Sequence, residues 1–141
     1  MRTANAAVLA LATCLLIAAD DPKTNAEKDR GNLQGNWTFV KAEENGVEGS
    51  LSDEQIKKYS MVIKGDSVVY QDRNQTTKSF VVDSTKTPKE IVFTRLQGQE
   101  KHIRKMTYSI EGDSLKLKFA GTGQRAGITT VMEYRRDAPK P

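Results

Sequence analysis

The sequence predicts an all-β protein, an eight-stranded antiparallel up-and-down barrel with one short helix after the first strand. Eight short segments alternate between apolar and polar side chains, as half-buried strands do. Mostly short turns join them, and no long helical segment between them is available to carry a parallel crossover. Eight consecutive antiparallel strands with one apolar face close most economically as a barrel, and a two-sheet sandwich is the competing architecture.

The alternation also sets which side chains share a face. In the first strand it places Trp37, Phe39 and Lys41 together. Two hairpins carry the same glycine-aspartate turn, at 65–66 and at 112–113, where the glycine takes a positive φ. The expected strands are residues 37–42, 59–64, 67–71, 78–83, 90–95, 102–110, 114–119 and 128–136.

The expected helix covers residues 51–58. Ser52 is a suitable N-cap, and Gln55 stands three residues later at the spacing of a capping box. Acidic residues come first and lysines last, an order that suits the helix dipole.

The N-terminus has the pattern of a secretory signal peptide over residues 1–19. Arg2 precedes an uncharged, mostly apolar run at 6–19, and two aspartates end it. We therefore expect an exported protein, in the periplasm or outside the cell, with an uncleaved anchor as the alternative. Cys14, the single cysteine, lies inside this leader, so the mature chain would have no disulfide and no thiolate site.

Residues 20–32 are charged and lack apolar periodicity, so we expect a linker there, followed by a single barrel domain over 33–137. The formal net charge is +4, and the positive residues are spread along the chain. This mild, dispersed excess argues only weakly for a nucleic acid or an anionic surface as a partner, and we expect no nucleic-acid partner. We expect a monomer.

The start of the first strand suggests how one end of the barrel closes. Gly35 lets the backbone turn sharply as the strand begins, and Trp37 is large enough to plug the end. The alternative is that Trp37 is an ordinary core residue, because this short motif is weakly specific.

Gly35-Asn36-Trp37, eight antiparallel strands and a basic residue on the last strand resemble the lipocalin and calycin pattern. The chain more closely resembles the lipocalin-like domain family known mainly from planctomycete bacteria, whose function is uncharacterised. The resemblance runs from about residue 33 to residue 136 and is carried by the blocks 33–46, 61–68, 87–91 and 108–117. It implies fold and export, and little about function.

In lipocalins a tryptophan on the first strand packs beneath an arginine near the end of the chain. The resemblance therefore implies that Arg136, which alternation places on one face with Met132 and Tyr134, stacks over Trp37. Arg135 takes this place if the register slips by one residue.

No constellation for catalysis, metal or cofactor binding stands out, and we expect a protein that is not an enzyme. The single histidine, His102, is interpreted as a solvated surface residue. A weaker hypothesis is a hydrolase or isomerase site in the barrel mouth. Lys101, Arg104 and Lys105, with Arg95 beside them, are interpreted as a basic cluster on the outer face.

The leading functional hypothesis is a small hydrophobic or amphipathic ligand held in the open end opposite the tryptophan. The alternative is a filled barrel that acts as a cell-envelope interaction module through its outer basic face. The residues expected to line a ligand site are Tyr70, Phe80, Phe93, Met106, Tyr108 and Met132.

Overall fold

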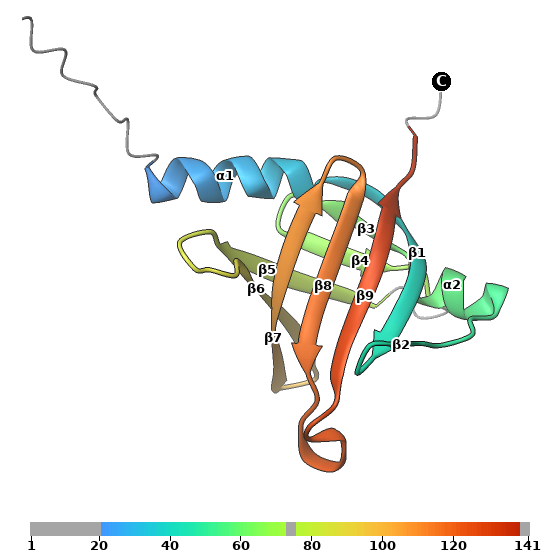
Figure 1. Ribbon diagram of the computed structural model, residues 1–141. Coiled ribbons are helices and arrows are strands. Elements are labelled where there is room, and N and C mark those ends of the chain that lie inside the picture. Colours follow the sequence, from blue (N-terminus) through green and yellow to red (C-terminus); the bar gives the residue numbers. More distant parts are fainter. Residues whose placement is uncertain (1–20, 73–75, 139–141) are drawn as a thin grey trace, which may run out of the picture.

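The computed structural model describes residues 21–72 and 76–138 and shows a closed antiparallel barrel (Figure 1). The sheet runs in the order β2-β1-β3-β4-β5-β6-β7-β8-β9, and β1 also pairs with β9. The β1–β9 pairing closes eight strands into a ring, while the two-residue β2 only extends the edge of β1. The predicted up-and-down barrel is confirmed, and the sandwich is excluded.

Each strand pairs with its neighbour in the chain because the connections are short. The elements are α1 (Pro22–Leu33), β1 (Gly35–Glu44), β2 (Val47–Glu48), α2 (Asp53–Tyr59), β3 (Met61–Lys64), β4 (Ser67–Tyr70), β5 (Thr77–Asp83), β6 (Glu90–Gln97), β7 (Glu100–Glu111), β8 (Ser114–Ala120), η1 (Gly123–Arg125) and β9 (Thr129–Arg136).

Helix α2 is the short helix expected after the first strand. The Ser52 hydroxyl accepts a hydrogen bond from the backbone N–H of Gln55, and the Gln55 side chain accepts one from the backbone N–H of Ser52. This capping box satisfies two backbone donors that the first turn leaves free. The predicted start signal is therefore confirmed.

A β-bulge in β1 changes which side chains face inward. Phe39 pairs with Tyr134, but the next pair is Lys41 with Glu133, so one residue is inserted between them. Beyond the bulge, Ala42 packs against the core, and Lys41 turns outward to within 3.9 Å of the Glu133 carboxylate. The expectation that Lys41 shares a face with Trp37 is therefore wrong, because a bulge shifts the alternation by one residue.

Trp37 closes one end of the barrel. Its side chain is fully buried, and its indole N–H donates a 2.7 Å hydrogen bond to the Leu33 carbonyl. The guanidinium of Arg136 lies over the indole, 4.4 Å from the ring centroid, as the lipocalin resemblance implied. Arg136 pairs directly with Trp37 across β1 and β9, so this contact sits on the seam that closes the ring.

Arg136 also joins the barrel to α1. Its guanidinium donates hydrogen bonds to the carbonyls of Asn32 and Gln34, at the C-terminal end of that helix. A cation at this position also interacts favourably with the helix dipole. Gly35 has a φ of +125°, and a Cβ there would lie 3.4 Å from the Arg136 guanidinium, so a glycine fits the backbone and the close approach.

Helix α1 occupies the segment where a linker was expected. It lies across the closed end of the barrel (Figure 1). The Asp21 side chain caps it by accepting from the Lys23 N–H, and a proline stands in its first turn. It has no apolar stripe, so hydrophobic periodicity could not reveal it.

A polar network holds α1 against the barrel. The Asp29 carboxylate is nearly buried and accepts hydrogen bonds from Lys89 (2.7 Å), Ser84 (2.8 Å) and Tyr108 (2.8 Å). Burial by itself would raise the pKa of Asp29, but the bonds from Lys89, Tyr108 and Ser84 outweigh it and hold that pKa below its ordinary value. The ionised carboxylate therefore stabilises the docked helix.

The expected leader at residues 1–19 lies outside the described residues. Within 21–72 and 76–138, no helix has the length and apolar character needed to span a membrane.

Replacing Arg136 with lysine should lower the free energy of unfolding by about 1–3 kcal/mol. Lysine keeps the charge but loses the planar fork that covers the indole and reaches two carbonyls. Trp37 is the only tryptophan, so its fluorescence during urea unfolding reports on this end of the barrel directly. Arg135→Lys, on the exposed neighbour, is the control and should change stability by less than about 0.5 kcal/mol. Equal effects of the two substitutions would show that the stacked arginine has no special role.

Asp29→Asn should destabilise the protein by about 1–3 kcal/mol at neutral pH, because three donors lose an ionised acceptor. The folded-state pKa of Asp29 is lowered, so its contribution is complete above the ordinary value of 3.8 and is lost as pH falls through the lower folded value. The difference in free energy of unfolding between wild type and the variant should therefore become smaller in urea titrations taken down to about pH 3. A gap that stays constant with pH would argue against an ionised Asp29 as the anchor.

Candidate functional site

The barrel opens, at the end away from Trp37, into a cavity of about 1390 Å³. Four of the six residues expected to contact a ligand line it: Tyr70, Phe93, Met106 and Met132. We call these four residues the cavity floor. Tyr70, Phe93 and Met106 are each less than 9% exposed, since they also belong to the hydrophobic core. The interior is therefore filled near the tryptophan and open at the other end.

The other two expected residues do not line this cavity. Phe80 is buried in the core, with its ring centroid 6.3 Å from that of Phe93. Tyr108 lies nearer the closed end, where its hydroxyl bonds to Asp29, and burial raises the pKa of that hydroxyl well above its ordinary value. Alternation correctly placed both residues inside the barrel, but it gives no position along the barrel axis.

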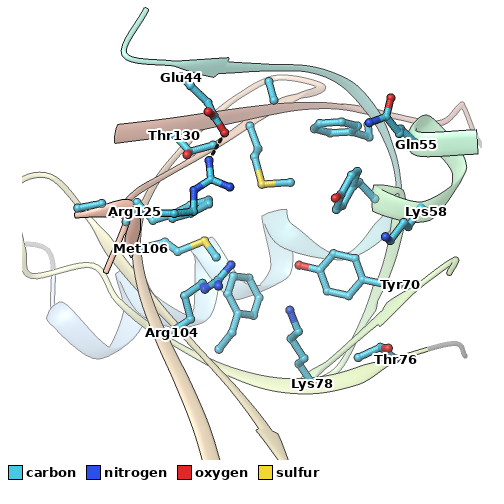
Figure 2. A pocket seen from close by; sticks show the side chains of 18 of the residues that line it. Glu44, Gln55, Lys58, Tyr70, Thr76, Lys78, Arg104, Met106, Arg125 and Thr130 are labelled. Atoms are coloured by element: carbon cyan, nitrogen blue, oxygen red, sulfur yellow. Dashed lines mark hydrogen bonds and ion pairs between the residues drawn. The ribbon is translucent and has the colours of Figure 1, made fainter. Parts of the chain in front are cut away.

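One side of the mouth carries an ion pair that the sequence analysis missed. The guanidinium of Arg125, in the loop between β8 and β9, bonds to the Glu44 carboxylate at the end of β1 (Figure 2). Glu44 pairs with Thr130 on β9, so the bulge that turns Ala42 inward also brings Glu44 to the mouth. This contact ties the glycine-containing loop to the first strand.

Arg104 faces the cavity, so the expectation of an outer-face cluster is wrong for this residue. It pairs with Phe93 across β6 and β7, and its guanidinium lies 5.0 Å from the centroid of the Phe119 ring. Arg95 is half-buried and also lines the cavity. Lys105, the neighbour of Arg104, forms a 3.0 Å ion pair with Glu90. Alternation from Met106 would have placed Arg104 inside.

Lys78 is a cavity residue that the sequence analysis did not single out. Its ammonium lies 4.4 Å from the centroid of the Tyr70 ring. Burial lowers the pKa of Lys78, the positive charges of Arg104 and Arg95 lower it further, and Asp72 opposes them. The spacing of Lys78 and Phe80 on one strand was the available signal, since alternate residues share a face.

Tyr70 contributes a phenol that stays protonated. Burial raises its pKa to about 12, although the charge of Arg104 acts in the opposite direction. The hydroxyl can therefore donate a hydrogen bond at any physiological pH.

His102 lies at the rim of the cavity, with its Nε2 atom 3.6 Å from a Glu100 carboxylate oxygen, and it is exposed as expected. Among residues 21–72 and 76–138, no three histidine, cysteine, aspartate or glutamate side chains gather closely enough to hold a metal ion. The features that distinguish the cavity are therefore its apolar floor and its cationic side chains.

No protein-family model matches this chain, and no curated protein or solved structure shows significant similarity to it.

Replacing Lys78 with methionine should raise the free energy of unfolding by about 1 kcal/mol at neutral pH. The substitution removes an ammonium that burial and two guanidiniums disfavour, while it retains an apolar stem. The folded-state pKa of Lys78 is lowered, so wild-type stability rises as pH climbs from that value toward the ordinary 10.5, and the advantage of the variant should shrink there. Lys118→Met, on the exposed face of β8, is the control and should be near neutral. A destabilised Lys78→Met protein would contradict this interpretation.

Proposed function

We propose that this chain is a lipocalin-like binding protein, not an enzyme, that holds a small amphipathic molecule in the open end of its barrel. The observation that carries the proposal is the cavity of about 1390 Å³, which has bulky apolar side chains at its base and polar groups at its mouth. Ligand sites in proteins combine a concave apolar surface with a few polar groups that fix orientation. The position of Trp37 supports this site, because the residues that seal the barrel lie at the end away from the cavity.

We also propose membership in the lipocalin-like domain family known mainly from planctomycete bacteria, and export through the leader at residues 1–19. The support for the family is the set of sequence blocks between residues 33 and 117. Two of these blocks contain the glycine-aspartate turns, whose glycines, Gly65 and Gly112, both have a φ of +59°. The support for export is the charge and hydropathy pattern of the leader.

A second candidate function is docking to the cell envelope through the outer face of β5, β6 and β7. Val81, Leu96 and Ile103 are 71%, 73% and 62% exposed, so apolar side chains project from this part of the sheet. Lys101 and Lys105 each stand two residues from Ile103 on β7, so alternation places them on the same face as Ile103. An apolar surface flanked by lysines suits an anionic membrane surface.

Native mass spectrometry of the purified protein, combined with thermal unfolding, tests the binding proposal. We expect a co-purifying adduct, or stabilisation by at least one of three probes that share a twelve-carbon chain: dodecanoate, dodecanol and dodecyltrimethylammonium. A probe present at one hundred times its Kd adds about 2.7 kcal/mol of stability.

A matched pair of variants locates the site. Ala42→Phe places a ring in the cavity and should abolish the stabilisation, whereas Val81→Phe on the outer face should leave it intact. A clean mass and no stabilisation by any of the three probes would reject the binding proposal and favour the envelope-docking alternative.

A further inference from the structure

Three cationic side chains line the cavity from three adjacent strands. Lys78 lies on β5, Arg95 on β6 and Arg104 on β7, and we call this group the cationic wall. The register explains why they meet: Phe80 pairs with Phe93, which in turn pairs with Arg104. Lys78 and Arg95 each stand two residues from one of these phenylalanines, on the same face and nearer the mouth.

Figure 2 shows the side chains of Arg104, Lys78 and Tyr70 directed into the same space from different parts of the barrel wall. The two cationic groups rest on aromatic rings: Lys78 on Tyr70, and Arg104 on Phe119. These contacts hold the charged ends within the cavity and leave their hydrogen-bond donors available.

The cationic wall is not neutralised by the protein itself. Within the part of the chain that the structure describes, Lys78, Arg95 and Arg104 form no ion pair, and Arg95 donates only to the Gln97 amide oxygen at 2.9 Å. Seven lysines and arginines line the cavity or its rim, against three carboxylates, but Lys105 is paired with Glu90 and Arg125 with Glu44. The region keeps an excess of positive charge.

The three carboxylates of the cavity lining are already engaged. Glu44 bonds to Arg125, and Glu48 lies 3.5 Å from the Lys41 ammonium. Asp72 accepts hydrogen bonds from the backbone N–H (2.9 Å) and the hydroxyl (2.8 Å) of Thr76. Asp72 is the acidic group that acts on Lys78, and its influence is weaker than that of burial and the two guanidiniums.

Holding like charges together in a partly desolvated site costs stability unless an opposite charge arrives. The depressed pKa of Lys78 is a sign of this cost. A feature that opposes folding and faces a cavity is typical of a binding site, where the ligand supplies the missing interaction.

We propose that the cationic wall binds the anionic head group of an amphipathic ligand, whose apolar part lies against the cavity floor. This inference rests on the proposed function and narrows it to one charge class. The planar guanidiniums of Arg95 and Arg104 match the two oxygens of a carboxylate, sulfate or phosphate, and Lys78 adds a point charge. The protonated Tyr70 hydroxyl is a further donor to the same group.

The head-group comparison is made with the three twelve-carbon probes, below their micellar concentrations, by titration calorimetry on the full mature protein. Dodecanoate should bind at least about tenfold more tightly than dodecanol, because charge-assisted bonds replace a neutral contact. Dodecyltrimethylammonium should bind more weakly than dodecanol. Added sodium chloride should weaken dodecanoate binding and leave dodecanol binding nearly unchanged.

The double variant Lys78→Gln/Arg104→Gln should lose the preference for dodecanoate while it keeps its affinity for dodecanol. Lys118→Gln, which removes a charge from the outside of β8, should keep the preference. Thermal unfolding of the double variant accompanies the titration, and we expect it to be at least as stable as wild type. If the double variant fails to fold, the order of affinity of the three probes for wild type, together with its salt dependence, still tests whether the head group is anionic.

Two results would overturn the proposal in distinguishable ways. Equal binding of dodecanoate and dodecanol by wild type would reject the anionic head group and leave the amphipathic binding function intact. No binding of any of the three probes would reject the binding function itself, and the head-group assignment with it. A preference for dodecanoate that survives in the double variant would place the anion elsewhere on the barrel.

Discussion

The contact of Arg136 with Trp37 is the interaction on which the arrangement of this barrel depends. It lies at the pairing of β1 with β9, the seam that turns an open meander into a ring. The same guanidinium bonds to the carbonyls of Asn32 and Gln34 at the end of α1, and the indole N–H bonds to the Leu33 carbonyl. One side chain therefore joins the first strand, the last strand and the N-terminal helix.

The two ends of the barrel differ, because the residues that close it are gathered at the Trp37 end. The region near Trp37 is packed with buried side chains, and α1 covers it through the hydrogen bonds of Asp29. The opposite end carries the cavity and the cationic side chains that line it, among them Lys78, whose pKa is lowered by burial. A barrel held together by its closed end can tolerate an unfavourable group such as Lys78 at its mouth.

Local patterns were enough to anticipate the strands, the glycine-aspartate turns and the capping box of Ser52 and Gln55. Each depends on neighbours within a few residues, so each is visible in the chain. Helix α1 was missed because it has no apolar stripe and its contacts, such as those of the Asp29 carboxylate, are with residues more than fifty positions away. The inward position of Arg104 follows from alternation, but its charge favoured the outer face in the sequence interpretation.

The sequence by itself determined an all-β chain and the order of its antiparallel strands, and the lipocalin resemblance named Trp37 and Arg136 as the sealing pair, which the β1–β9 register then selected over Arg135. Only the tertiary structure decided which inward residues line the cavity and which fill the core. Phe93 and Phe80 face the same interior, yet only Phe93 lines the cavity. Alternation fixes only which face of its strand a residue occupies. Depth in the barrel depends on the register between strands and on the bulge before Lys41. Register and bulge are set by contacts between residues distant in the chain, so the sequence pattern of one strand does not reveal them.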